Sequence, residues 1–379
     1  MASDTIQYFA SPSGPAVSET LLAWAREAPR SAVLALIAED DKAEIPALQQ
    51  SCNAARLPLM GAMFPELLDG EGFKRHGVLL LRLERKPEYR IVEGLSASPT
   101  EDGRPIEEIA EVAASLEGNH GKGTLLMIFD AMVPTIESWL AAVYRRIGRK
   151  VNYLGVNAGS ETFQPVPCLF DNQRTAGDAV LVAALPHLPG GVLEHGYRPP
   201  GRMITATATE GNRIISIDWR PALEVYAELA RQEYQIEITR DNFYENGVHF
   251  PFGIVRASGE VVVRIPVAID DDNALFCIGE VPENAILTLL RAGSVDPRLT
   301  VDRLVQDLGE IGSPSMLTFY CAGRRMHDPR GAAEELKLLA RKLPVPLAGA
   351  LSLGEIGSSM RDGYPLFHNA TLVCAEWSE

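Results

Sequence analysis

The amino-acid sequence predicts a mixed α/β protein in which β-α-β-β units repeat on mixed sheets around a mainly antiparallel β insert. Three observations predict this fold class. Apolar runs of strand length alternate with segments of helical spacing, the phrase Pro-Leu-x-Gly-Ala occurs twice at the same place in such a unit, and one stretch between units is rich in short strands and turn residues. Strands that alternate with helices are typical of α/β folds, and short strands in series are typical of antiparallel sheets.

The first unit begins with the apolar run Ala32–Ala38, which has the length and composition of a buried strand. Helical spacing follows over Glu44–Arg56, and Pro58–Ala62 then leads through Glu66 into a second long strand at Val78–Leu83. The expected order is therefore strand, helix, short strand, glycine turn and strand.

The same order recurs twice more. The last unit consists of a strand at Met316–Cys321, a helix at Gly331–Lys342, a short strand at Pro346–Ala350, Glu355, and a closing strand at Ala370–Trp377. A looser middle copy consists of a strand at Thr124–Asp130, a helix at Pro134–Ile147, a short strand at Asn152–Val156, Glu161, and a strand at Ala179–Leu185. Repetition of one supersecondary unit constrains the whole architecture.

The turns after the short strands are candidate ligand sites. In each unit the strand–helix–strand crossover should be right-handed and should join parallel strands, whose carboxyl ends bind ligands in open sheets. The loops Gly61–Glu66, Gly155–Glu161 and Gly349–Glu355 are therefore candidate site loops, and Gly61, Glu66, Gly349 and Glu355 are candidate ligand-binding residues. The alternative is that the glycines only permit a positive φ angle at a tight turn and that the glutamates are solvated.

The segment from about Gly201 to Gly312 predicts the antiparallel insert. Met203–Thr209 and Arg213–Trp219 flank a Gly-Asn turn and should form a β-hairpin. The further elements expected here are a helix at Pro221–Arg231, strands at Phe252–Val255, Glu260–Ile265 and Phe276–Gly279, an amphipathic helix around Ala285–Leu290, and a linking segment at Val301–Leu308. A boundary near Pro199-Pro200-Gly201 divides the chain into residues 1–200 and 201–379.

The charge balance disfavours two classes of partner. The 35 basic and 50 acidic side chains give a formal net charge of −15, which repels nucleic-acid phosphates and anionic lipid headgroups. No apolar run approaches the ~20 residues of a membrane span, and the N-terminus lacks the features of a secretory signal. We therefore expect a cytoplasmic protein that binds neither nucleic acid nor membranes.

Motifs for standard enzyme chemistry are absent from the sequence. There is no G-x-G-x-x-G, G-x-S-x-G or H-E-x-x-H motif, so we do not expect an enzyme. The cysteines occur singly, without zinc-type spacing, and we expect them to be buried reduced thiols without a structural metal. They are Cys52, Cys168, Cys277, Cys321 and Cys374.

The C-terminal part of the sequence closely resembles the C-terminal block of FIST sensory domains. The resemblance rests on Met316–Arg324, Glu334-Glu335, Ala348–Ala350, Gly354–Gly357 and His368–Leu372. Upstream, His195–Gly201 and Pro221–Tyr226 look like the join between the N- and C-terminal parts of the family. The resemblance implies a FIST N-terminal domain at 1–200, a FIST C-terminal domain at 201–379, and a small-ligand sensor in signal transduction.

A finer resemblance is to the haem-containing nitric-oxide sensors of this class, which act on a separate histidine kinase. It implies haem as cofactor and a two-component partner such as a histidine kinase. The sequence leaves open whether the chain forms a homo-oligomer. Haem iron needs a neutral imidazole nitrogen, and His195 beside Tyr197 is the axial ligand that we would choose, with His249 as the next candidate. Arg198 or Arg202 would meet a haem propionate. The alternative is that His195 is a hydrogen-bonded structural residue in a turn.

Two further candidates are His368 and Asn369 in the terminal motif. They could bind a ligand, but we expect mainly fold support, with both residues buried and bonded to main chain. Other function classes also remain open: a non-haem metabolite sensor, a protein scaffold, or a cysteine hydrolase with Cys321 as nucleophile, His368 as base and Glu355 as orienter.

Overall fold

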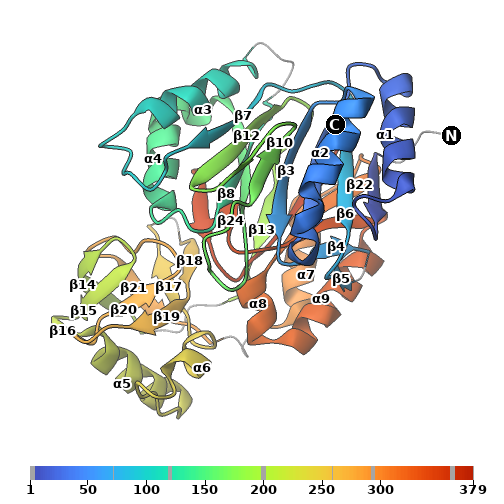
Figure 1. The fold of residues 1–379 in the computed structure, drawn as a ribbon. Coiled ribbons are helices and arrows are strands. Elements are labelled where there is room, and N and C mark those ends of the chain that lie inside the picture. Colours follow the sequence, from blue (N-terminus) through green and yellow to red (C-terminus); the bar gives the residue numbers. More distant parts are fainter. Residues whose placement is uncertain are drawn as a thin grey trace.

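Four sheets organise the chain. The computed structural model describes residues 5–70, 72–117, 122–197, 202–257, 259–291, 295–358 and 363–378. In these residues the strands form three six-stranded mixed sheets and one eight-stranded antiparallel sheet. The three mixed sheets and their helices are called the body, and the antiparallel sheet with its helices, residues 202–291, is called the insert. Figure 1 shows the insert at the lower left, beneath the body.

Each mixed sheet is built on one of the repeated units. The first unit contains β2 (Ala32–Ala38), α2 (Ile45–Ala55), β3 (Leu59–Phe64) and β6 (Val78–Leu83). β2 pairs parallel with β3 and antiparallel with β6. Helix α2 connects two parallel neighbouring strands, so the expected parallel pairing is confirmed for this unit.

The other two units have the same pairing. The middle unit contains β8 (Thr124–Asp130), α4 (Ile136–Ile147), β9 (Asn152–Ala158) and β12 (Ala179–Leu185). The last unit contains β22 (Ser315–Cys321), α9 (Pro329–Lys342), β23 (Leu347–Ser352) and β26 (Leu372–Trp377). In both units the first strand pairs parallel with the second and antiparallel with the last, so the predicted repeat is confirmed.

The units exchange short hairpins in a ring. The hairpin β4 (Leu67–Asp69) and β5 (Gly72–Lys74) follows β3 in the chain but pairs with β23 of the last unit. The hairpin β10 (Leu169–Asp171) and β11 (Thr175–Ala176) follows β9 but pairs with β3. The hairpin β24 (Glu355–Gly357) and β25 (Leu366–His368) follows β23 but pairs with β9. Each sheet therefore contains strands from two units, which ties the three units into one body.

The repeated glycines lie inside strands and not in loops. Gly61, Gly155 and Gly349 occupy the middle of β3, β9 and β23, and none has a positive φ angle. A Cβ on Gly61 would lie 2.3 Å from Phe170 Cζ, and one on Gly155 would lie 2.5 Å from the carbonyl oxygen of Met127. The expectation that these glycines begin site loops is therefore wrong. They recur because each admits a close approach of neighbouring chain.

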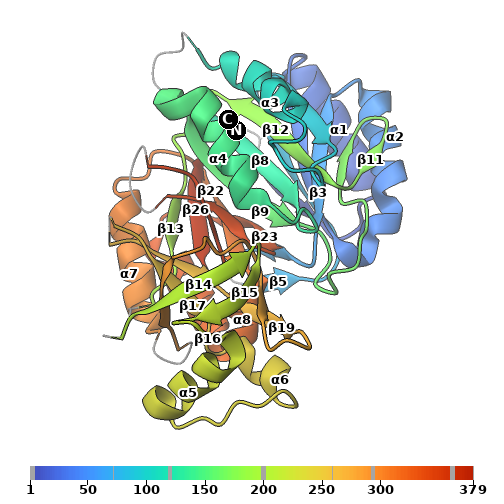
Figure 2. The same cartoon turned by 90° about the vertical axis from the view of Figure 1, so that its left-hand side faces the viewer.

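Both faces of the body sheets are buried, which explains why their strands are continuous apolar runs. On β22, Leu317 and Phe319 point into a core shared by all three sheets, whereas Met316 and Tyr320 face the covering helices. Figures 1 and 2 show these helices on the outside of the body. They are α1 (Pro15–Glu27) with α2, α3 (Arg104–Ala114) with α4, and α7 (Pro297–Leu308) with α9. The remaining body elements are β1 (Ile6–Phe9), β7 (Tyr89–Glu93), β13 (Val192–Glu194) and α8 (Ala322–His327), and 3-10 turns at Glu39–Glu44 and Gly148–Lys150.

The insert is an antiparallel sheet, as expected, with the strand order β18-β17-β21-β14-β15-β20-β19 and β16 beside β15. Its elements are β14 (Ile204–Glu210), β15 (Arg213–Ile217), β16 (Arg220–Pro221), α5 (Ala222–Tyr234), α6 (Phe243–Gly247), β17 (Phe252–Val255), β18 (Val261–Arg264), β19 (Pro266–Ile269), β20 (Leu275–Cys277) and β21 (Ile286–Leu289). The helix expected around Ala285–Leu290 is wrong, because that segment forms β21. Leu287 and Leu289 are buried in the insert core, and their spacing of two is the period of a strand.

A buried arginine joins the insert to the body. Arg264 of β18 donates hydrogen bonds to the carbonyl oxygens of Phe367 and Glu280, both at 2.9 Å. It also forms an ion pair with Glu137 of α4. The insert is therefore fixed to both the middle and the last unit.

The helices of the body and insert are short. The longest in the described ranges, α9, has 14 residues, and none of the described helices has the length and apolar composition needed to cross a membrane.

Candidate functional site

The carboxyl ends of the central strands β3, β9 and β23 meet at one place. Main-chain hydrogen bonds join the three ends: Gly159 N–H to Met63 at 2.9 Å, Leu351 N–H to Glu66 at 2.8 Å, and Leu353 N–H to Asn157 at 3.0 Å. The three loops after β3, β9 and β23 therefore surround a common centre.

Arg325 of α8 is the cationic partner of two glutamates from the predicted site loops. Its guanidinium forms ion pairs with Glu66 at 2.9 Å and with Glu161 at 2.8 Å. Glu66 comes from the first unit and Glu161 from the middle unit, so Arg325 links three units at the centre. Glu66 therefore has a cationic partner in this structure, which ties the loop after β3 to α8.

Glu355 has a different environment. It is fully buried at the start of β24. Ser352 Oγ donates a hydrogen bond to it at 2.6 Å, and Thr371 Oγ1 and the Cys321 thiol also donate to it. Burial raises the pKa of Glu355 to about 7, although these three hydrogen bonds oppose the shift. A buried carboxyl whose partners are hydroxyls and a thiol is poised for proton transfer.

Replacement of Glu355 with glutamine should make stability less dependent on pH. The pKa of Glu355 rises from an ordinary value of 4.5 to about 7 on folding. Its contribution to stability is therefore complete below pH 4.5 and is lost as the pH rises through 7, by roughly 3 kcal/mol over the window. Melting curves at about pH 5 and about pH 8 measure this effect. We expect wild type to lose stability relative to Glu355→Gln at the higher pH, and an unchanged difference would contradict the assignment.

Cys321 lies beside Glu355 at the end of β22. Its Sγ accepts a hydrogen bond from the main-chain N–H of Ala370 at 3.1 Å. Burial, and next the negative charge of Glu355, raise the pKa of this thiol well above its usual range. Cys321 is therefore a neutral thiol next to a carboxyl group.

A small pocket opens in front of Cys321, between the body and the insert. Its volume is about 90 Å³. Three large apolar side chains in its lining are solvent-exposed, with exposed fractions of 41% for Phe163, 75% for Tyr244 and 52% for Met326. The pocket is lined by Glu161, Phe163, Tyr244, Val248, Ile265, Pro266, Val267, Ile278, Cys321, Ala322, Gly323, Met326, Leu353 and Asn369. We call it the body–insert pocket.

Both ring nitrogens of His195 are occupied. Nδ1 accepts a hydrogen bond from the main-chain N–H of Tyr197 at 3.0 Å, so Nε2 carries the proton and donates to the carbonyl oxygen of Val261 at 3.1 Å. Burial lowers the pKa of His195 to about 4, and the ring is neutral. An iron ligand needs a free nitrogen lone pair, so His195 does not fit a haem site in this arrangement. It fits the alternative of a structural histidine.

The other residues expected around a haem are dispersed. Arg202 is exposed and donates a hydrogen bond to Gln232, and Arg198 lies outside the described residues. Tyr197 is buried in a small apolar cluster. The ring of His249 lies 5.8 Å, between centroids, from that of His327. Haem binding at another position stays a prediction.

His368 and Asn369 are buried, as expected, but only Asn369 bonds as expected. Asn369 Oδ1 accepts a hydrogen bond from the main-chain N–H of Ile265 at 3.4 Å, and its Nδ2 donates to the carbonyl oxygen of His368. Neither ring nitrogen of His368 makes a well-aligned hydrogen bond with a described residue, contrary to expectation. His368 is therefore not hydrogen-bonded to Cys321 or Glu355, and the triad of a cysteine hydrolase is not assembled.

Sequence reasoning missed a buried ion pair behind the pocket. Arg324 and Glu335 pair in the interior, and Tyr320 donates a hydrogen bond to Glu335 at 2.5 Å. Arg324 also donates to the carbonyl oxygens of His195 at 2.6 Å and Ala370 at 3.0 Å. Arg324 and Glu335 both lie in segments that carry the FIST resemblance, but a single sequence gives no sign that they meet.

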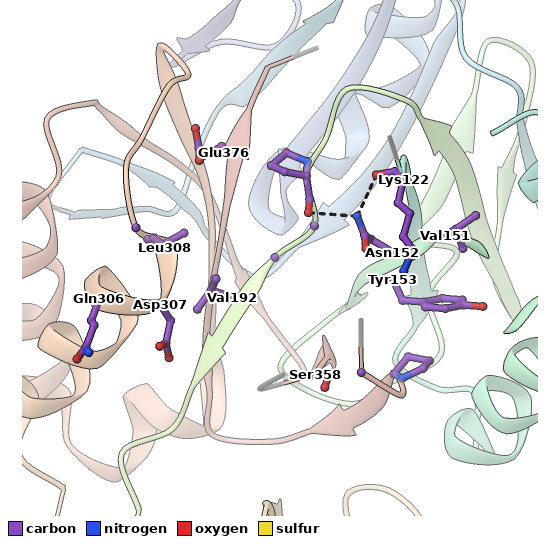
Figure 3. A pocket seen from close by; sticks show the side chains of 16 residues that line it. Lys122, Val151, Asn152, Tyr153, Val192, Gln306, Asp307, Leu308, Ser358 and Glu376 are labelled. Atoms are coloured by element: carbon purple, nitrogen blue, oxygen red, sulfur yellow. Dashed lines mark hydrogen bonds between the residues drawn. The ribbon is translucent and has the colours of Figure 1, made fainter. Parts of the chain in front are cut away.

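A larger cleft of about 750 Å³ lies elsewhere in the body. Figure 3 shows Lys122 and Tyr153 on one side and Asp307 and Leu308, at the end of α7, on the other. The cleft is open and polar, and it contains none of the predicted site residues. Ligand sites usually combine apolar walls with a few polar groups, so the body–insert pocket is the better candidate.

The fold and the pocket define a class of protein: an α/β protein with a small pocket lined by both the body and the insert. Family models match the chain as a FIST N domain over residues 31–220 and as a FIST C domain over residues 222–358. The chain belongs to the FIST family, and the resemblance found in the sequence is confirmed. No curated protein matches the chain in sequence. FIST domains are sensory domains of signal transduction that bind small ligands.

Proposed function

We propose that this chain senses a small uncharged ligand in the body–insert pocket and that a separate signalling protein reads its occupancy. The proposal rests on the observation that the body and the insert both contribute residues to the pocket lining. Cys321, Leu353 and Asn369 come from the body, whereas Val248 and Val267 come from the insert. A ligand that contacts both the body and the insert stabilises one arrangement of these two parts over others. A coupling free energy of about 1–3 kcal/mol is usual in such cases.

The pocket favours a small and largely apolar molecule. A volume of about 90 Å³ lies between the space of one water and the ~150 Å³ cavity that holds benzene. The walls offer the Asn369 amide and the Cys321 thiol as polar groups, and Glu161 at the pocket already pairs with Arg325. An uncompensated charge would be costly to bury here. We therefore expect an uncharged ligand, and a molecule as large as benzene or phenol should enter the pocket only in part, with the rest of its ring on the exposed rim.

The resemblance to haem-containing sensors suggests the class of partner, a histidine kinase of a two-component system. Haem itself is not included in the proposal, because both ring nitrogens of His195 are engaged. An interface that changes with ligand occupancy is sufficient for signalling to a separate protein. The proposal requires that ligand occupancy changes the position of the insert relative to the body.

Filling the pocket should abolish ligand binding. Val267 of β19 lines the pocket, whereas its neighbour Ala268 is exposed and is not among the lining residues. We expect phenol to raise the melting temperature of wild type and of Ala268→Phe, but not of Val267→Phe. At ten times Kd the stabilisation is about 1.4 kcal/mol. Thermal melts against phenol concentration measure it, and equal stabilisation of all three chains would place the phenol site elsewhere.

A further inference from the structure

The body–insert pocket has a thiol in its wall. Cys321 is the one cysteine among its lining residues. All five cysteines are buried and unpaired. Cys374, on the adjacent strand β26, makes a fair comparison, because it is equally buried and its Sγ contacts Thr318 Oγ1 at 3.6 Å. Burial alone therefore does not distinguish the two thiols, whereas access from the pocket does.

Glu355 stands behind this thiol as a proton acceptor. The groups that face its carboxyl are the Cys321 thiol from β22, the Ser352 hydroxyl from β23 and the Thr371 hydroxyl before β26. His368 is its cross-strand neighbour on β25, and burial holds the pKa of that ring well below its usual range, so it is neutral. A carboxylate in hydrogen-bond contact with a thiol can take its proton as the sulfur attacks.

We propose that the body–insert pocket captures small uncharged carbonyl compounds, such as aldehydes, as reversible covalent adducts of Cys321. The S–C bond forms as the π bond of the C=O group breaks. The thiol proton passes to Glu355 and from Glu355 to the new alkoxide oxygen, which leaves a neutral hemithioacetal. The addition needs no oxidant or reductant, and its reversal regenerates the thiol and the aldehyde. The inference rests on the proposed function and names the ligand class of the same pocket.

A matched pair of alkylating probes tests access to the thiol. Iodoacetamide is neutral and iodoacetate is an anion of almost the same size. The pocket is mainly apolar, Glu161 lines it, and Glu355 lies beside the thiol, so the anion should be excluded. In the native chain we expect iodoacetamide to label Cys321 before Cys374, as followed by peptide mass spectrometry. The preference for iodoacetamide over iodoacetate should exceed that of the unfolded chain by at least about tenfold.

The rate at which Cys321 is labelled tests whether Glu355 accepts the thiol proton. Labelling of Cys321 by iodoacetamide should be at least about tenfold slower in Glu355→Gln than in wild type at neutral pH. If that variant does not fold, the wild-type pH profile serves instead. The rate should rise as Glu355 ionises, with a midpoint near its pKa of about 7, and then level off, whereas a free thiol continues to gain reactivity up to about pH 8.5. A profile that follows the thiol alone would overturn the proton transfer.

Butanal tests the carbonyl capture directly. Preincubation with butanal should slow the labelling of Cys321 in a saturable way, and dilution should restore the rate. Labelling of Cys321 no faster than of Cys374, or no protection by butanal, would overturn the inference. If phenol still stabilises wild type but not Val267→Phe in that case, the pocket binds ligands without covalent capture. If phenol does not bind and butanal still protects Cys321, the non-covalent sensor proposal fails and the thiol assignment stands.

Discussion

Replacement of Gly349 with alanine is expected to destabilise the chain by at least about 3 kcal/mol, a large part of an ordinary free energy of unfolding of about 5–15 kcal/mol. A Cβ at this position would lie 1.8 Å from the carbonyl oxygen of Thr318 and 2.7 Å from its carbonyl carbon. Both atoms belong to the main chain of β22, the parallel neighbour of β23. Main chain in a central strand cannot move aside without breaking the sheet. Denaturant unfolding of the variant measures the loss.

Gly72 provides the control for this substitution. It lies on β5 of the same sheet, where a Cβ would meet nothing within 4 Å. Gly72→Ala should therefore change the free energy of unfolding by no more than about 0.5 kcal/mol. If Gly349→Ala unfolded at the same denaturant concentration as Gly72→Ala, close strand approach would not be the reason for the repeated glycine.

The second large effect is expected at the buried ion pair. Arg324→Met should lower the free energy of unfolding by about 3–5 kcal/mol, because it leaves Glu335 buried without a cation. It also removes the hydrogen bonds to the carbonyl oxygens of His195 and Ala370. The exposed pair Lys342–Asp302, with exposed fractions of 43% and 50%, is the control. Lys342→Ala should cost less than about 1 kcal/mol.

A double variant separates the ion pair from packing. Arg324→Met combined with Glu335→Leu removes both charges, so it should recover part of the stability that Arg324→Met loses. Chemical denaturation of the single and double variants measures the coupling. A double variant less stable than Arg324→Met would show that Glu335 is held by other partners, of which Tyr320 is the nearest candidate.

The repeated units were readable from the sequence because their strands are buried on both faces. A run such as Ala179–Leu185 carries no polar residue, and the amphipathic helices between the runs have an apolar face that must cover a sheet. The exchange of hairpins was not readable. Strands such as Leu67–Asp69 and Glu355–Gly357 have only three residues each, and nothing local indicates which sheet they join.

The glycine motif shows how a correct pattern can receive a wrong explanation. Pro-Leu-x-Gly-Ala correctly marked equivalent positions, but glycine serves both turns and close strand contacts. Only the pairing of β3 with β10, and of β23 with β22, distinguishes the two uses at Gly61 and Gly349. Ala285–Leu290 was ambiguous for a similar reason, since a short apolar segment fits a strand as well as a helix.

The candidate site was partly predictable. Glu355 and Asn369 lie in segments that resemble the family, and the structure brings them close to Cys321. The pocket rim was not predictable, because Phe163 comes from the loop after β9 and Tyr244 from the short helix α6, and neither segment has a recognisable motif. The prediction of His195 as an iron ligand depended on residue type alone. Main-chain groups occupy its ring, and a sequence does not show where main-chain groups point.

Hydrogen–deuterium exchange with and without saturating phenol tests the central claim most directly. A ligand held between the body and the insert should slow exchange on both sides of the pocket, in α8 (Ala322–His327) and in β19 (Pro266–Ile269). Val267→Phe should lose both effects and Ala268→Phe should keep them. Two results would contradict a sensor whose ligand lies between the body and the insert. One is protection confined to the segments of the larger cleft, around Asn152 and Asp307, and the other is no protection at all.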